Sequence, residues 1–394
     1  MNGMISLPIP PKFGGGTEQM IYDLAKYLSQ KDLEIHIVVS QKNKKIIQDK
    51  QIFSYHGIPY NKDTFHFPKA CLQYPITFPS FLLLDAKYNF DLFHIFHGWS
   101  PLCMKLTAKM RSKPYVFSEF NHYPWLQLGD AAKLHIKIAS MISKSAAAVI
   151  TPSEIIRQKI IENVKGINPN TVKMIPHAID TMKFNPTING NIIRERFKIN
   201  DKPLILSVGR LDPHKGAKNI IMAFKSVKKV IPDAILMFVG PKLESFHHTF
   251  ECKHSKFYIY LSKLISKNKL SDSIIFTGVV PRQELPYYFA ASDIFVLPSK
   301  MEAFGVVFIE AMSSGKPVVT SNLPPMNTLI DDASGILINP DDYDQLSKSI
   351  IYLLNEPKLA KKKGMAGRAK VEKIYNWDFV SEQYLEIYKE ISNK

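Results

Sequence analysis

The chain has 394 residues, 45% hydrophobic and 22% charged, a composition typical of a globular protein that is too long for one core. A net charge of +16 suits anionic partners, but the sequence contains no signature of a DNA- or RNA-binding module. Its first residues do not resemble a signal peptide, and it has no apolar run of about 18 residues, so we expect neither a cleaved signal nor a spanning helix. Its three scattered cysteines favour a reducing compartment, and we expect a cytoplasmic protein.

Short apolar runs alternate with amphipathic helical patterns along the whole chain. A helix over residues 17–31 follows the first predicted strand. Strands are predicted at residues 3–7, 34–39, 92–96, 115–118, 147–151, 172–176, 204–208, 234–239, 274–278, 294–298 and 317–321. These runs are continuously apolar, which is typical of strands buried on both faces of a parallel sheet. The pattern predicts an α/β fold with doubly wound, Rossmann-like domains.

The strand pattern stops over residues 180–202, where polar and turn residues dominate. We therefore predict an N-terminal domain over residues 1–183 and a C-terminal domain over residues 184–375. Two such domains imply a cleft between them. Open α/β sheets bind ligands beyond the carboxyl ends of their strands, so the loops after strands are the places to search for chemistry.

The stretch "PPKFGGGTEQ" places Gly14, Gly15 and Gly16 between the first strand and a helix that starts near Thr17. Consecutive glycines let backbone amides approach an anion, and a helix start adds partial positive charge. The spacing does not match the dinucleotide-binding fingerprint. The loop is either an anion-binding turn or a flexible connection.

A second loop, "SVGRLDPHKG", carries Arg210 and Lys215 after the strand at 204–208. A guanidinium and an ammonium placed together suit a diphosphate, the first through paired hydrogen bonds and the second as a point charge. The alternative is two solvated surface cations. Their position at the carboxyl end of a strand favours binding.

The third loop lies in "SKMEAFGVVFIEAMSSGKPVV" and holds Glu302 before an apolar helix that contains Glu310. A buried carboxylate is costly unless it is paired, so each needs a partner. Hydroxyls of a bound sugar could serve, or Glu310 could pair with a lysine across a helix interface. The first-turn amides would point at a ligand; they belong to Phe304, Gly305, Val306 and Val307.

Taken together, these stretches resemble retaining family 4 glycosyltransferases of the GT-B fold over nearly the whole chain. The resemblance also includes "TPSEIIRQKII", "IPHAIDTMKFNP" and "GVVPRQELPYYFAASDIFVLPS". It implies two Rossmann-like domains that face each other across a cleft. It further implies that Arg210 and Lys215 bind the diphosphate of a nucleotide sugar, that Glu302 contacts the donor sugar and that Glu310 holds the ribose.

Other positions follow from the same resemblance. Gly15 and Gly16 match a glycine loop that faces the diphosphate and the acceptor. The segment "GVVPRQEL", with Val280, corresponds to a loop that packs against the nucleotide base. The C-terminal helix, residues 376–394, is expected to cross back onto the N-terminal domain.

The chain departs from the family at the histidine of its N-terminal domain. The direct match is Phe120 in "PYVFSEFNHYPW", and His122 lies two positions later. We take His122 as the functional equivalent, and His97 after the preceding strand is a second candidate. A lone histidine is also common as a structural residue.

The predicted function is retaining transfer of a sugar from a nucleoside-diphosphate sugar to a glycan or lipid-linked hydroxyl acceptor. No Asp-x-Asp pair lies beside the cations, so we expect no metal and no cofactor. The alternatives are a sugar-nucleotide epimerase, a phosphorylase, or a carbohydrate-binding subunit without activity. The basic and aromatic stretches "MKLTAKMRSKPY" and "NHYPW" add the hypothesis of peripheral binding to an anionic membrane.

Overall fold

The structure is a computed structural model that describes residues 2–6, 16–40, 54–58, 74–96, 101–120, 130–241 and 251–393. Two compact units make up the chain. The N-terminal unit comprises Met1–Ala178 with Trp377–Lys394, and the C-terminal unit comprises Ile179–Asn376. The boundary predicted from the sequence lies after residue 183, whereas the compact units divide after Ala178.

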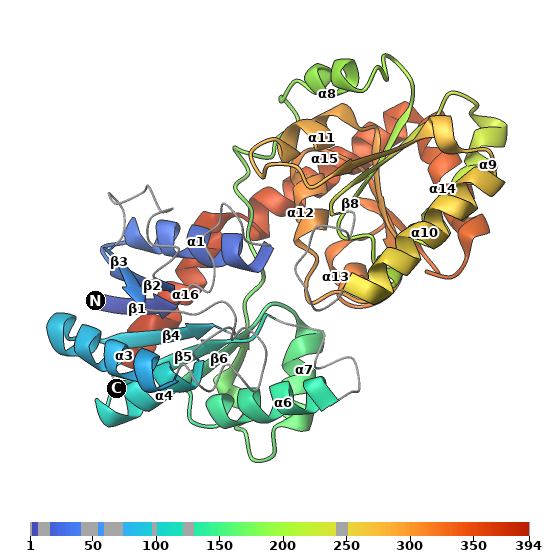
Figure 1. Cartoon of the computed structure of the whole chain (residues 1–394). Helices are drawn as coiled ribbons and strands as arrows, with labels where there is room; N and C mark the ends of the chain where they lie inside the picture. Colours follow the sequence, from blue (N-terminus) through green and yellow to red (C-terminus); the bar gives the residue numbers. More distant parts are fainter. Residues whose placement is uncertain are drawn as a thin grey trace. The chain divides into compact units, whose positions relative to one another are not determined.

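The N-terminal unit is built on a seven-stranded parallel sheet in the order β3-β2-β1-β4-β5-β6-β7 (Figure 1). Its strands are β1 (Asn2–Ser6), β2 (Glu34–Ser40), β3 (Ser54–Ile58), β4 (Leu92–Phe96), β5 (Tyr115–Ser118), β6 (Ala148–Thr151) and β7 (Val172–Met174). Its helices are α1 (Gly16–Ser29), α3 (Tyr74–Tyr88), α4 (Pro101–Met110), α6 (Asp130–Ser143), α7 (Glu154–Asn163) and α16 (Trp377–Ser392), with the short 3-10 helix η3 (Pro169–Thr171).

Helices cover both faces of this sheet. On one face, α1 and the C-terminal helix α16 share an apolar cluster with side chains of β2, β4, β5 and β6. On the other face, α3, α4 and α6 pack against one another and α4 packs on β4 (Figure 1). In α1, Met20, Ile21, Leu24 and Leu28 are buried, which is the face expected from their helical spacing.

The C-terminal unit has a six-stranded parallel sheet in the order β10-β9-β8-β11-β12-β13. Its strands are β8 (Leu204–Val208), β9 (Ile235–Val239), β10 (Ile274–Gly278), β11 (Ile294–Leu297), β12 (Val318–Ser321) and β13 (Gly335–Ile338). Its helices are α8 (Asn191–Arg196), α9 (Ala217–Val230), α10 (Glu251–Lys267), α11 (Leu285–Ala291), α12 (Val306–Ser313), α13 (Met326–Leu329), α14 (Tyr343–Asn355) and α15 (Pro357–Ile374), with η4 (Pro213–Lys215) and η5 (Ser271–Ser273).

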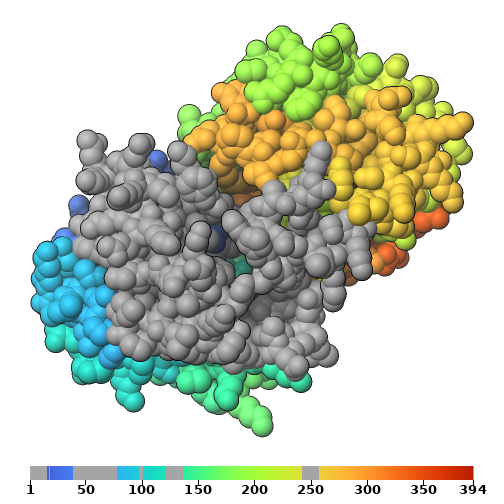
Figure 2. All heavy atoms as spheres, viewed as in Figure 1, coloured from blue at the N-terminus to red at the C-terminus, as the bar shows by residue number. Residues whose placement is uncertain are grey.

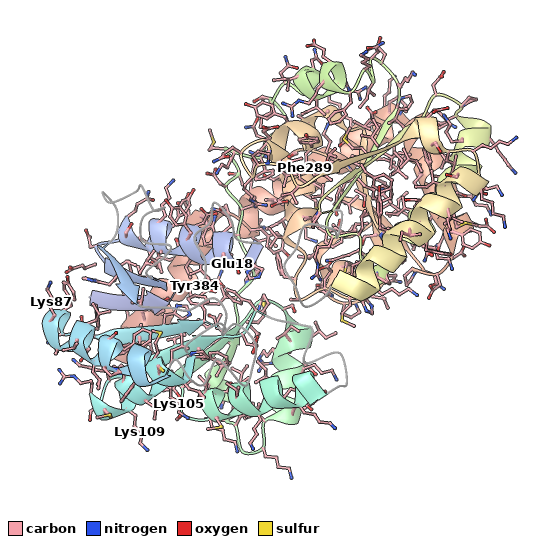
Figure 3. All side chains as sticks on the ribbon, in the orientation of Figure 1. Glu18, Lys87, Lys105, Lys109, Phe289 and Tyr384 are labelled. Carbon is pink, nitrogen blue, oxygen red and sulfur yellow. The ribbon has the colours of Figure 1, made fainter. Side chains whose placement is uncertain are left out.

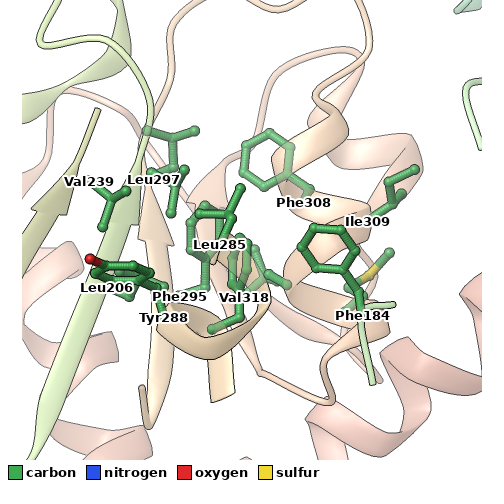
Figure 4. Packing of buried hydrophobic residues seen from close by; sticks show 14 of the residues in the cluster. Phe184, Leu206, Val239, Leu285, Tyr288, Phe295, Leu297, Phe308, Ile309 and Val318 are labelled. Carbon is green, nitrogen blue, oxygen red and sulfur yellow. The ribbon is translucent and has the colours of Figure 1, made fainter. Parts of the chain in front are cut away.

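Successive side chains of these strands point to two separate apolar cores. Leu206, Phe295 and Val318 join the core beneath α11, α12 and α15 (Figure 4). Ile205, Ile294 and neighbouring strand residues join the second core, beneath α9, α10 and α14. Helix α12 is apolar on nearly all sides because it is buried within its core.

The predicted fold class is confirmed, and every predicted strand has a counterpart. Strands β3 and β13 were not predicted. Strand β3, "SYHGI", mixes polar residues with glycine, and β13, "GILI", lies between the turn-forming stretches "DDAS" and "NPDD", so neither gives a strong strand signal. Among the described residues, no helix is long and apolar enough to cross a membrane.

Candidate functional site

The strand order of the C-terminal unit reverses between β8 and β11. The chain runs from β8 outward to β9 and β10, and then returns to the other side of β8 with β11. The loops after β8 and β11 therefore lie side by side at the carboxyl edge of the sheet, where doubly wound folds bind ligands. Backbone contact confirms this, because the Lys300 amide donates to the His214 carbonyl at 2.7 Å.

Close backbone packing fixes these two loops against each other. Gly216, at the end of the first loop, has a φ of +76°, and a Cβ there would lie 2.5 Å from the Pro298 carbonyl oxygen. A larger residue would be strained in this conformation and would separate the loops. Ser299 adds a hydrogen bond from its hydroxyl to the His214 carbonyl at 3.2 Å.

Lys215 and Glu302, one from each loop, form an ion pair with 2.5 Å between Nζ and Oε1. Only 17% of the lysine side chain and 7% of the glutamate side chain are exposed. The two residues that the sequence assigns to the diphosphate and to the donor sugar therefore contact each other directly. Each compensates the other's charge in a largely desolvated place.

Arg210 lies on the same loop but is held more loosely. Half of its side chain is exposed, and its Nη2 atom lies 3.3 Å from the carboxylate of Asp212. Asp212 is buried and also accepts a hydrogen bond from the His214 amide at 2.8 Å, so it fixes the start of η4. This arrangement leaves the guanidinium exposed at the edge where an anion would bind.

Helix α12 starts directly after the Glu302 loop. Gly305 precedes it with a φ of +96°, and a Cβ there would lie 2.4 Å from the Phe308 ring. Phe304 is buried, with its ring edge-on to Tyr375 at 5.8 Å, so the loop is anchored in the core. Val306 begins the helix, whose amino end carries partial positive charge beside the Lys215–Glu302 pair.

Glu310 is fully buried in the middle of α12, and its partner is Arg282 from the segment between β10 and α11. Arg282 Nη2 and Glu310 Oε1 form an ion pair, yet neither carboxylate oxygen has a well-aligned hydrogen bond among the described residues. The sequence analysis considered a lysine as the partner of Glu310. The structure instead supplies an arginine.

Arg282 is the site residue that the sequence analysis missed. It lies in the quoted segment "GVVPRQEL", where only Val280 was selected; Val280 is partly buried against the apolar core, and its contact with a base stays a prediction. The signal was indirect, because a carboxylate in an apolar helix requires a cation. Only the fold brings a residue 28 positions earlier (310 − 282) to that carboxylate.

The predicted residues of the N-terminal unit mostly lie outside the described residues. This holds for Gly15, His97 and His122. Gly16 is described as the exposed first residue of α1. Phe120, at the family's histidine position, is buried with its ring edge-on to His177 at 4.6 Å. The roles of these positions stay predictions.

Paired aspartates of the C-terminal unit have structural roles. Asp342 caps α14 by accepting from the Gln345 amide at 2.8 Å, and Asp331 pairs with Lys370 at 3.0 Å. Within the described ranges, no group of three or more histidine, cysteine or acidic residues is arranged to hold a metal.

Partly buried Lys316 also has structural partners. Burial lowers its pKa to about 8, and its amine donates to the carbonyls of Ala290 (3.0 Å) and Ser292 (2.6 Å) at the end of α11. These contacts assign it to a helix end.

Comparison with known proteins identifies the family. The model for glycosyl transferases group 1 matches residues 190–370, and the model for Glycosyltransferase Family 4 matches residues 14–183. The chain therefore belongs to the family 4 glycosyltransferases, as its sequence motifs indicate.

Individual relatives agree with this assignment. A GDP-mannose-dependent α-(1-6)-phosphatidylinositol monomannoside mannosyltransferase of Mycolicibacterium smegmatis is 30% identical over 49% of this chain, and the match spans half (50%) of the relative's length. Sulfoquinovosyl transferase SQD2 of Arabidopsis thaliana is 28% identical over 94% of this chain and 69% of its own.

Solved structures support the fold. Sucrose-phosphate synthase from Thermosynechococcus elongatus superimposes with a TM-score of 0.84 at 20% identity, covering 99% of this chain and 98% of that one.

Proposed function

We propose that the protein transfers a glycosyl group from a nucleoside-diphosphate sugar to a hydroxyl acceptor, with retention of the anomeric configuration. One observation supports this most: the Lys215–Glu302 pair, with exposed Arg210 beside it, lies where the strand order reverses. The leaving diphosphate gains charge as the glycosidic bond breaks. Fixed cations and helix-start amides aimed at that charge lower the barrier.

A metal-independent mechanism follows from the same charges. Lys215, Arg210 and the amino end of α12 together offer positive charge to a diphosphate without a divalent ion. When the donor binds, the Lys215–Glu302 ion pair would break. Glu302 would then accept hydrogen bonds from hydroxyl groups of the donor sugar, and Lys215 would bind the diphosphate. Glu310 would accept hydrogen bonds from the ribose.

The test combines binding and turnover. Calorimetry with UDP, GDP and ADP in the presence of a chelator should show binding of one nucleotide. Incubation with the corresponding nucleotide sugar should release the nucleoside diphosphate, and NMR of the product should show the donor's anomeric configuration. Absence of nucleotide binding would overturn the proposal, and epimerisation of the donor without its cleavage would favour the epimerase alternative.

For the acceptor, we propose a saccharide or lipid-linked molecule at an anionic membrane surface. The helix layer α3–α4–α6 of the N-terminal unit exposes Leu83 (71%), Leu106 (49%), Met110 (64%) and Met141 (48%). Lys105 and Lys109 lie on α4 (Figure 3), next in sequence to Leu106 and Met110, and atoms of α4 and α6 reach the surface along one edge of the unit (Figure 2). Exposed apolar side chains among cations suit an anionic lipid surface.

Co-sedimentation with vesicles tests this surface. Wild-type protein should bind vesicles that contain anionic lipid and dissociate at high salt. The variant K109Q/K137Q/K144Q, which removes exposed lysines of α4, of α6 and of the position directly after α6, should bind weakly. The matched control is K218Q/K225Q/K229Q on α9, which removes as many charges from the C-terminal unit. Equal binding by both triple variants, or equal binding to neutral vesicles, would overturn this part of the proposal.

A further inference from the structure

Glu310 presents a physical problem that its ion pair only partly resolves. It is fully buried on α12, a helix whose Phe308, Ile309 and Met312 belong to the apolar core. A carboxylate has about four lone-pair positions, and a buried one normally fills them with hydrogen bonds. Here neither oxygen has a well-aligned hydrogen bond from a described residue. Arg282 therefore balances the charge but leaves acceptor capacity unused.

Arg282 is itself held from its other side. Its guanidinium carbon lies 5.6 Å from the centre of the Phe184 ring, within the range of a cation–π contact. Phe184 is 1% exposed, so the ring is a fixed surface. The guanidinium is thus placed between a carboxylate and an aromatic face, while 30% of its side chain stays exposed. A planar guanidinium suits both contacts, whereas an ammonium lacks the flat face.

The aromatic surface is anchored to the helix that carries Glu310. The Phe184 carbonyl accepts hydrogen bonds from the Ser313 hydroxyl at 2.6 Å and from Arg368 at 2.7 Å. Ser313 lies on α12 three positions after Glu310 (313 − 310), and Figure 4 shows Phe184 beside this helix. Glu310, Arg282, Phe184 and Ser313 therefore form a closed series of contacts. A shift of Arg282 would disturb two of its members.

We propose that Arg282 is a positioning residue for nucleotide recognition. Held by Phe184, it keeps the Glu310 carboxylate in place, so that the lone pairs of this carboxylate accept the hydroxyls of a bound ribose. This rests on the proposed function, because it needs a nucleotide at the carboxyl edge of the sheet. A purely structural pair would only offset charge, and its loss would affect stability without affecting recognition of one hydroxyl.

The experiment compares a ribonucleotide with its 2′-deoxy analogue. Calorimetry is carried out with UDP, GDP and ADP, each compared with its 2′-deoxy analogue. Wild-type protein should prefer the ribose form by about tenfold or more, as expected for a hydroxyl bonded to a charged acceptor. In Arg282→Met this preference should fall to within about twofold. Glu310→Gln should behave the same way, and the double variant should be no worse than either single variant.

Arg196→Met is the matched control. Arg196 pairs with Glu284 at 2.7 Å, only two positions from Arg282, but both side chains are exposed at 45% and 36%. This variant should keep the full ribose preference. Arg282→Lys tests the flat guanidinium: it keeps the charge and should recover only part of the preference.

The outcomes separate the two proposals. If wild-type protein binds a nucleotide and Arg282→Met keeps the full ribose preference, the inference is wrong and the proposed function stands. If wild-type protein binds none of UDP, GDP and ADP, the proposed function fails and the inference falls with it. Circular dichroism establishes folding first. Should Arg282→Met not fold, Arg282→Lys decides, because an unchanged preference in that variant also overturns the inference.

Discussion

The two units share one topology but bury their polar groups differently. Each sheet reverses its strand order, between β1 and β4 in one unit and between β8 and β11 in the other. In the C-terminal unit, the described loops at the reversal bring charges into direct pairs, as in Lys215–Glu302. In the N-terminal unit, a polar group lies within the sheet, where His94 contacts Tyr388 at 2.5 Å and Ser118 at 2.7 Å.

This difference shows how one fold separates binding from stability. Paired charges beside an exposed edge can exchange partners with a charged ligand. A histidine enclosed by hydroxyl groups cannot exchange its partners for a ligand in this way. Burial also lowers the pKa of His94 to about 3, so this histidine stays neutral. We therefore expect substitutions to affect chemistry in the C-terminal unit and acid stability in the N-terminal unit.

The largest expected effect is that of Lys215→Met. It removes a diphosphate cation and leaves Glu302, 6% exposed, without its partner. The loss should be roughly 2–4 kcal/mol at the transition state, about 30- to 1000-fold in kcat/KM. Steady-state kinetics with the donor measures it. Arg210→Met should lower kcat/KM by a smaller factor, because the side chain of Arg210 is half exposed. A larger loss of kcat/KM in Arg210→Met than in Lys215→Met would contradict this order.

The two carboxylates should separate in kinetics. Glu302→Gln should lower kcat with little change in nucleotide affinity, because its sugar contact strengthens as the bond breaks. Glu310→Gln should chiefly raise KM and weaken binding of the free nucleoside diphosphate, by about 1.5–3 kcal/mol. Calorimetry and donor kinetics on each variant test this division. It is wrong if both variants lose turnover and affinity in equal proportion.

Acid should act mainly through the N-terminal unit. Burial lowers the pKa of both His94 and His177 to about 3, from 6.5. Between these values the unfolded chain binds protons that the folded chain does not, so the free energy of unfolding falls as the pH falls below 6.5. Each histidine contributes up to about 1.4 kcal/mol per pH unit.

Urea unfolding at about pH 7 and about pH 5 measures this slope. His94→Gln should remove about half of it. An unchanged slope in this variant would show that other groups govern acid sensitivity.

The C-terminal unit should show a weaker dependence at alkaline pH. Burial lowers the pKa of Lys316 to about 8 from 10.5. Over that interval the unfolded chain holds the extra proton, so the free energy of unfolding rises with pH and is lower below pH 8. This single group contributes up to about 1.4 kcal/mol per pH unit. Unfolding of Lys316→Met across the same interval should lack the rise, and an equal rise would refute the assignment.

The sequence predicted the strands well because parallel strands buried on both faces are continuously apolar. The runs at residues 92–96 and 204–208 match β4 and β8 in full. Helix α12 also follows from its sequence, since Gly315 and Pro317 end it. Strand β13 could not be predicted, because its glycine and three apolar residues lie between stretches of turn-forming residues.

Partners of buried charges were harder to predict than elements. The cations Arg210 and Lys215 could be assigned to one loop, but their different exposure depends on contacts with Asp212 and Glu302. Arg282 is separated from Glu310 by β11 and α11, so its pairing depends on how the helices pack. Propensity and spacing describe local structure, whereas a salt bridge across the core is a property of the tertiary fold.

The smallest expected effect concerns the C-terminal helix α16. Lys31 and Glu382 join the end of α1 to α16 with 2.6 Å between Nζ and Oε2, but 25% and 48% of their side chains are exposed. Exposed pairs are screened by water and salt. The helix is held instead by buried apolar contacts, including Trp377, which is 2% exposed and stacks on Tyr27 at 5.4 Å.

Glu382→Gln should therefore leave the thermal midpoint almost unchanged at high salt, whereas Trp377→Leu should lower it at any salt concentration. Thermal unfolding followed by circular dichroism at low and high salt compares the two variants. A loss in Glu382→Gln as large as in Trp377→Leu would mean that the ion pair, rather than the apolar contacts, secures α16.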